Sequence, residues 1–270
     1  MSFLDNLKPP CFALRRNAKP HQKPSRCRRI FLISFCLCIA FGAWWLLTSH
    51  KGKSLFLGNE PAGLARSQRV LGIDVSKHQG KINWRKVAKH RHNGESIRFA
   101  IVKATEGVTK VDKRFDENFQ ALQRNHIVRG AYHFYLPHKP ARLQAMRYIS
   151  KVRLSKGDLA PILDVEPTDD YNVEELQESV LTWLNIVESH YGVTPIIYTS
   201  PSIKSTYLDS PKFNRFRWWI AHYNTSQPRH KGHWDFWQFT ELGKVDGIKG
   251  NTVDLNYFNG NLKRLQTLTL

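Results

Sequence analysis

The sequence predicts an α/β fold: an irregular (β/α) barrel of eight strands with about five helices, preceded by one transmembrane helix. Three observations lead to this prediction. Short apolar or β-branched runs recur eight times after residue 69, helical patterns lie between several of them, and a long uncharged run stands near the N-terminus. Strands that alternate with helices favour a parallel sheet, and eight strands in about 200 residues favour closure into a barrel.

The expected strands are short runs rich in β-branched and aromatic residues. They are Val70–Val75, Arg98–Ala104, Val128–Tyr135, Leu159–Val165, Thr194–Thr199, Arg217–Tyr223, Trp234–Phe239 and Val253–Phe258. The expected helices are Trp84–His90, Phe115–Asn125, Ala141–Val152, Val173–Tyr191 and Ser202–Leu208. Val173–Tyr191 has the clearest helical repeat, because Leu176, Val180 and Trp183 recur at three- and four-residue steps. The later helices are short, so we expect an irregular barrel.

The uncharged run, IFLISFCLCIAFGAWWLLT, spans residues 30–48 and is long enough for a helix to cross a bilayer core of about 30 Å. Eight Lys and Arg residues precede it with Asp5 as the only acid, whereas only Lys51 and Lys53 follow closely. Under the positive-inside tendency, the N-terminus stays in the cytoplasm and the rest is exported. A cleaved signal peptide is the alternative, but the run is long for one and no A-x-A-like site follows it.

We therefore expect a single-pass protein of the cell (inner) membrane. Its parts would be a basic cytoplasmic tail over 1–29, a transmembrane anchor over 30–48, a linker over 49–69 and a barrel over 70–265, exported to the periplasm or the cell exterior. All four cysteines, Cys11, Cys27, Cys36 and Cys38, lie in the tail or the anchor. The exported part therefore needs no disulfide and depends on its own core.

The chain is strongly basic, with a formal net charge of +19. The residues after position 53 contain 31 basic and 21 acidic side chains, so the exported part is also basic. Such a domain is attracted to anionic cell-wall polymers, phospholipids or nucleic acid. No nucleic-acid-binding module is recognisable, so we expect envelope affinity and no nucleic-acid partner. We expect a monomer.

Acidic residues gather where the strands are expected to present reactive groups. Asp74 closes the first strand, Asp164 and Glu166 close the fourth, and Asp254 opens the last, with Glu106 as a weaker fifth candidate. Barrels of this type carry their active sites at the C-terminal ends of the strands.

Asp164 and Glu166 are separated by one residue, so on a strand both point to the same face, about 6.5 Å apart. Two close carboxylates resist ionising together, and one then holds a proton near neutral pH. A general acid that protonates a sugar leaving group needs this property. The competing interpretation is two ion-paired or solvated acids, but the apolar run before Asp164 and Pro167 after Glu166 favour a strand end.

Aromatic and histidine side chains near the same strand ends are candidates for binding sugar, although core packing is the alternative for strand aromatics. They are Tyr132, His133, Tyr198, Trp219, His222 and Trp237. The twelve histidines form no metal-binding pattern, so we predict neither a catalytic metal nor a cofactor. The exported part has no cysteine and no G-x-S-x-G elbow, which argues against a nucleophilic triad.

Seven separated strings of the chain, in the same order, resemble glycoside hydrolase family 25, the Chalaropsis-type lysozymes of bacteria, phages and fungi. The strings are GIDVSKHQGKINW (72–84), FAIVKATEG (99–107), RGAYHFY (129–135), PILDVE (161–166), PIIYTS (195–200), WIAHY (219–223) and WQFTELGKVDGIKGNTVDLNYF (237–258). The resemblance covers about residues 70–260 and implies an N-acetylmuramidase. It also implies that Glu166 is the proton donor and that Asp74, Asp164 and Asp254 complete the acidic floor.

The expected reaction is hydrolysis of the β-1,4 bond from N-acetylmuramic acid to N-acetylglucosamine in peptidoglycan. Asp164 would attack the sugar, activate water, or steady an attacking 2-acetamido group. An i, i+2 pair falls between the roughly 5.5 Å of retaining and 6.5 Å of inverting sites, so stereochemistry stays open. One alternative is a non-catalytic cell-wall glycan-binding module, which the four retained acids disfavour. Another is a chitinase-like endo-N-acetylglucosaminidase, whose longer D-x-x-D-x-D-x-E pattern needs acids where Leu159 and Ile162 stand.

Overall fold

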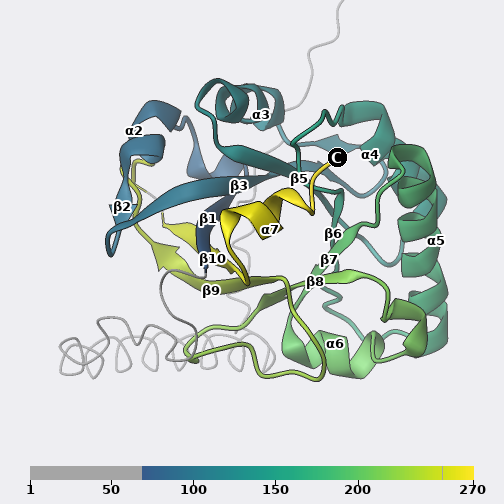
Figure 1. Ribbon diagram of the computed structural model, residues 1–270. Coiled ribbons are helices and arrows are strands. Elements are labelled where there is room, and N and C mark those ends of the chain that lie inside the picture. The colour runs from purple at the N-terminus through teal and green to yellow at the C-terminus, as the bar shows by residue number, and fades with distance from the viewer. Residues whose placement is uncertain (1–68, 251) are drawn as a thin grey trace, which may run out of the picture. The chain divides into compact units, whose positions relative to one another are not determined.

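The computed structural model describes residues 69–250 and 252–270, which contain the expected barrel (Figure 1). The expected cytoplasmic tail, the expected membrane anchor and all but the last residue of the expected linker lie outside the described residues. Within the described ranges, no helix combines the length and the apolar character needed to cross a membrane.

Ten strands and six α-helices alternate along the described part of the chain, together with two 3-10 helices. In chain order they are β1 (Val70–Val75), η2 (Lys77–Gln79), α2 (Trp84–Lys89), β2 (Arg91–His92), β3 (Glu95–Glu106), β4 (Lys110–Val111), α3 (Phe115–Arg124), β5 (Val128–Phe134), α4 (Ala141–Lys151), β6 (Ile162–Asp164), α5 (Val173–Tyr191), β7 (Ile196–Thr199), α6 (Pro201–Tyr207), η3 (Pro211–Phe213), β8 (Arg217–Ala221), β9 (Phe236–Gly243), β10 (Val253–Phe258) and α7 (Leu262–Gln266).

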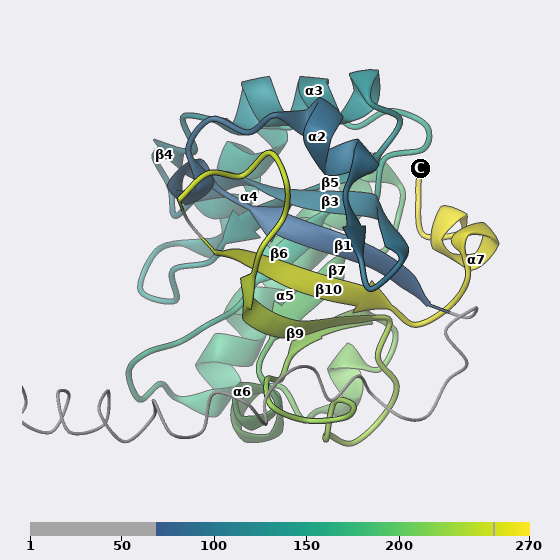
Figure 2. The same ribbon diagram turned by 90° about the vertical axis from the view of Figure 1, so that its left-hand side faces the viewer.

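Eight of these strands close into a barrel in the order β1-β10-β9-β8-β7-β6-β5-β3, with β3 pairing back onto β1. Figure 2 shows β9, β10, β1 and β3 side by side, with β4 near one end of the strands and α7 near the other. The predicted eight-stranded α/β barrel is confirmed. The sequence did not predict β2 and β4, which are two-residue strands paired with β3.

The expectation of a parallel sheet is wrong for β10, which runs antiparallel to both β1 and β9. The connection from β9 to β10 carries no helix in its described residues, so the chain turns back directly instead of crossing over. A parallel neighbour would require a crossover of a dozen or more residues. This reversal brings the start of β10 to the end of β1, where Asp74 faces Asp254 in the register of the two strands.

The predicted helices are all present, and α5 has the predicted bounds. The Asn172 side chain accepts a hydrogen bond from the Glu175 amide at the start of α5, and Gly192 ends the helix in the left-handed conformation. The sequence missed α7, because five residues are too few to show a helical repeat. The chain after α7 also contacts the barrel, since the Ala160 amide donates to the Leu268 carbonyl.

Alternate residues of the strands build two separate layers of core. Ile162, Ile196, Phe236 and Phe258 point into the barrel, whereas the neighbouring side chains pack between the sheet and the helices. Figure 1 shows α3, α4 and α5 on the outer side of the barrel strands. Because side chains alternate along a strand, the parity of a residue decides whether it can reach the barrel interior.

Candidate active site

A cavity of about 220 Å³ lies at the end of the barrel where Asp74, Asp164 and Asp254 are placed. Seven of the ten predicted site residues line it: Asp74, Asp164, Glu166, Asp254, Tyr132, Tyr198 and Trp219. It is also lined by Ser76, His78, Lys103, Phe134, Tyr223, Gln238 and Glu241. The fold therefore brings four acids from three distant parts of the sequence to one site.

Asp74 and Asp254 form one carboxylate pair on neighbouring strands. The Oδ2 atom of Asp74 accepts hydrogen bonds from Gln238 Nε2 at 2.9 Å and from Asn256 Nδ2 at 2.7 Å. Burial raises the pKa of Asp74 well above its usual value, and the nearby charge of Asp254 raises it further. Burial also raises the pKa of Asp254, although a hydrogen bond with Asp74 opposes that effect. The carboxyl groups of this pair therefore keep their protons to a higher pH than exposed aspartates do.

Asp164 and Glu166 form the second pair. Asp164 ends β6, and its Oδ1 atom is buried without a hydrogen-bond partner. Burial raises the pKa of Asp164 well above its usual value, and the charge of Glu166 adds to this increase. Burial also raises the pKa of Glu166, against the opposing effects of the neighbouring Tyr198 hydroxyl group and the charge of Lys103. Two such acids release their protons as a coupled pair, with one neutral while the other is charged.

Two buried amides connect the aromatic residues of the cavity to Asp74. Gln238 accepts hydrogen bonds from the hydroxyl groups of Tyr198 and Tyr223 while it donates to Asp74. Asn256 accepts a 2.8 Å hydrogen bond from Trp219 Nε1 while it donates to Asp74. These bonds fix the amide orientations, so both amides present N–H groups to the carboxylate.

Three predicted sugar-binding residues lie outside the cavity lining. His133 is fully buried on the outer side of β5, where it stacks against Trp183. Trp237 is also buried on the outer side and donates from Nε1 to the His222 carbonyl at 2.8 Å. His222 follows β8 and accepts a hydrogen bond from the Arg229 amide at its Nδ1 atom.

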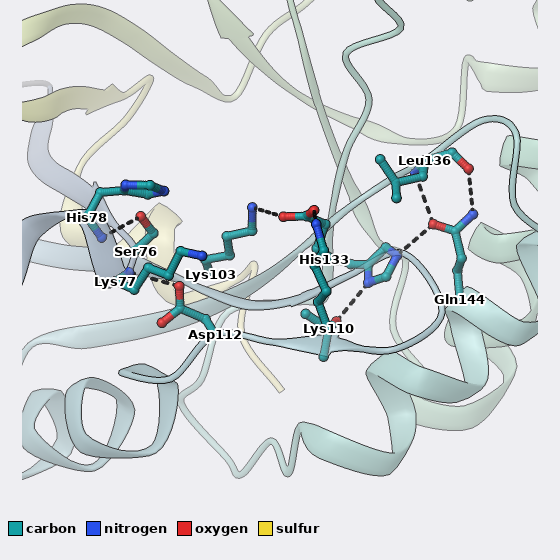
Figure 3. Close-up of polar contacts among 11 residues, drawn as sticks. Ser76, Lys77, His78, Lys103, Lys110, Asp112, His133, Leu136 and Gln144 are labelled. Atoms are coloured by element: carbon teal, nitrogen blue, oxygen red, sulfur yellow. Dashed lines mark hydrogen bonds and ion pairs between the residues drawn. The ribbon is translucent and has the colours of Figure 1, made fainter. Parts of the chain in front are cut away.

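His133 has a structural role in this arrangement (Figure 3). Gln144 donates its Nε2 protons to the carbonyls of Leu136 and Lys139, so its Oε1 atom accepts a hydrogen bond from His133 Nε2. The Nδ1 atom of His133 then accepts from the Thr105 hydroxyl at 2.7 Å. Burial lowers the pKa of His133 to about 4, which keeps the ring neutral.

Gln238, Asn256 and Lys103 were missed by the sequence reasoning, which searched for acids and aromatic rings. Strand parity is the signal that finds Asn256, which lies two residues after Asp254 on β10. No such count finds Gln238 or Lys103, because the register of β9 and of β3 shifts before the acid of each strand.

The sequence model of "Glycosyl hydrolases family 25" matches residues 73–248. The chain is 43% identical over 201 residues to "Uncharacterized protein YegX" of Escherichia coli, covering 74% of this chain and 73% of that protein. It is 32% identical over 223 residues to "Lysozyme M1" of Streptomyces globisporus, covering 76% of this chain and 73% of that protein. A family 25 glycosyl hydrolase from Bacillus anthracis has a similar structure, with a TM-score of 0.69 at 29% identity, covering 79% of this chain and 99% of that one.

Proposed function

The chain belongs to glycosyl hydrolase family 25, and from this premise we propose that its cavity hydrolyses the glycan strands of peptidoglycan. The bond cut is the β-1,4 bond between N-acetylmuramic acid and N-acetylglucosamine. Similarity to Lysozyme M1 supports this substrate. The observation that carries the proposal is the convergence of four carboxyl groups on one cavity, with burial raising the pKa of each.

Glu166 is the proton donor in this proposal. Its raised pKa lets it hold a proton at a pH where an exposed glutamate is ionised. It lines the cavity and is only partly buried, so its carboxyl group is accessible to a bound glycan. Protonation of the glycosidic oxygen turns a poor leaving group into a neutral alcohol.

The proposed reaction requires Asp164 to be ionised while Glu166 holds the proton, although burial raises the pKa of Asp164 well above its usual value. Its Oδ1 atom is buried without a hydrogen-bond partner, and in this proposal its negative charge stabilises the positive charge that develops on the sugar ring in the transition state. The rings of Tyr132, Tyr198 and Trp219 line the same cavity and provide faces for the sugars.

Replacement of Glu166 by Gln tests this assignment, because glutamine keeps the size of the side chain and removes the transferable proton. We expect the Glu166→Gln variant to release reducing ends from purified peptidoglycan at least about 100-fold more slowly, the lower range for general acid catalysis. Binding to peptidoglycan should persist. Asp170→Asn, which changes an exposed loop acid, is the control and should keep normal activity. Normal activity of Glu166→Gln would contradict the assignment.

We also propose that residues 30–48 anchor the enzyme in the cell membrane, with the barrel outside the cytoplasm. The uncharged length of this run and the basic residues before it support the proposal. A reporter enzyme that is active only outside the cytoplasm, fused after Leu270, should be active in the full-length chain. Deletion of residues 1–53 should abolish that activity and leave the protein in the cytoplasm. Reporter activity that survives the deletion would contradict the anchor.

A further inference from the structure

Glu106 lies behind the cavity wall and binds two lysines. Its Oε2 atom accepts a hydrogen bond from Lys103 Nζ at 2.8 Å, and its Oε1 atom accepts one from Lys110 Nζ at 2.5 Å. Figure 3 labels both of these lysines. The Lys110 side chain is 69% exposed, whereas that of Lys103 is 15% exposed and lines the cavity. Of these two lysines, Lys103 is the one that presents its charge to the site.

The local fold fixes this carboxylate. Glu106 ends β3 and pairs with Lys110 on β4, so the two side chains are cross-strand neighbours in a hairpin. Gly107 begins the turn with a φ of 54°, and its amide donates to the Phe134 carbonyl at 3.1 Å. Burial alone would raise the pKa of Glu106, but the hydrogen bonds and charges of the two lysines lower it to about 2. Glu106 is therefore ionised at neutral pH.

The ammonium group of Lys103 pairs with this anion, and the Lys103 side chain lines the cavity that holds the catalytic acids. Its Nζ atom is 4.4 Å from the centre of the Phe134 ring, a cation–π contact that also holds it at the cavity wall. Asp164 and Glu166 line the same cavity, yet among the described residues the ion pair of Lys103 is with Glu106 and with neither of these acids. A direct ion pair with Glu166 would favour its ionised form and remove the proton that it must donate.

We propose that Glu106 is a positioning residue for the hydrolysis, because it holds the Lys103 ammonium group at a distance where the charge acts on the catalytic acids without pairing with them. This inference rests on the proposed function of Asp164 and Glu166. Burial raises the pKa of both acids, the charge of Lys103 opposes that increase at both, and the charge of Glu106 adds to it at Asp164.

Other charged and titratable groups face the same cavity and stay unchanged in the experiment below. They are Asp74 on β1, His78 on η2, Tyr132 on β5, Tyr198 on β7, Tyr223 after β8, Glu241 on β9 and Asp254 on β10. Their effects are common to all the variants, so differences between variants report the charges on β3 and β4 alone.

The test is the pH dependence of kcat/KM for the full-length chain in detergent, measured by release of reducing ends from peptidoglycan. In Lys103→Met the cation is absent, so both acids hold their protons to higher pH and both limbs of the profile should move to higher pH. In Glu106→Gln an anion is absent and Lys103 is free to approach the acids, so both limbs should move to lower pH. The double variant lacks both charges, and its limbs should lie between those of the single variants.

Lys110→Met is the matched control, because it also deprives Glu106 of a lysine but leaves Lys103 in place. Its limbs should coincide with those of the wild type. Limbs that move in the same direction in Lys103→Met and Glu106→Gln, or that stay fixed in Glu106→Gln, would overturn the proposal. If Lys103→Met fails to fold, Glu106→Gln alone decides by the direction of its shift. Absence of activity in the wild-type chain would instead refute the proposed function.

Discussion

The two carboxylate pairs of the cavity differ in how firmly the protein holds them. Asp74 accepts two amide hydrogen bonds from residues that are themselves held by Trp219 and two tyrosines. Asp164 has an oxygen with no partner. A buried polar group without a partner is expensive for folding, so its presence suggests a group that is completed by substrate. We call Asp74 and Asp254 the fixed pair and Asp164 and Glu166 the open pair. The fixed pair shapes the site, and the open pair is placed to react.

Asp164→Asn tests this difference with the largest expected effect. The substitution keeps the shape of the side chain and removes its charge, so peptidoglycan hydrolysis should fall at least about 100-fold. Thermal stability at neutral pH should rise, because the buried group is then neutral without taking up a proton. Hydrolysis assays and thermal unfolding of the same preparations measure both effects.

The sign of the stability effect follows from the raised pKa of Asp164. Protonated Asp164 stabilises the folded protein below the unfolded-state pKa of about 3.9, and this contribution is lost as the pH rises through the higher folded-state pKa. The gain in Asp164→Asn should therefore be absent in acid and grow toward neutral pH. Asp74→Asn should gain less, since two amides already compensate the charge of Asp74. A larger gain in Asp74→Asn would contradict the comparison.

The open pair could be predicted from the sequence because its signal is local. Asp164 and Glu166 follow one apolar run at a spacing that puts both on one face of a strand, and the structure brings both to the cavity. The fixed pair depends on β10 running antiparallel to β1, which no local pattern indicates. Asp254 was found through its acidic side chain and the family resemblance, while the amides that hold Asp74 were missed. Amides occur in many loops and strands, so only their placement in the fold shows their role.

Asn256→Leu breaks the fixed pair and should have the smaller effect. Asn256 is fully buried, and leucine of similar volume would leave both Trp219 Nε1 and one lone pair of Asp74 without their partner. A buried group that loses its hydrogen bond destabilises a protein by about 1–3 kcal/mol, and Asp74 keeps the bond from Gln238. We therefore expect the free energy of unfolding to fall by about 2 kcal/mol in urea titrations. Asn185→Leu, on the exposed face of α5, is the control and should change it by less than about 0.5 kcal/mol. Equal stabilities of the two variants would mean that the amides do not hold Asp74, and the contrast between the two pairs would then have no energetic basis.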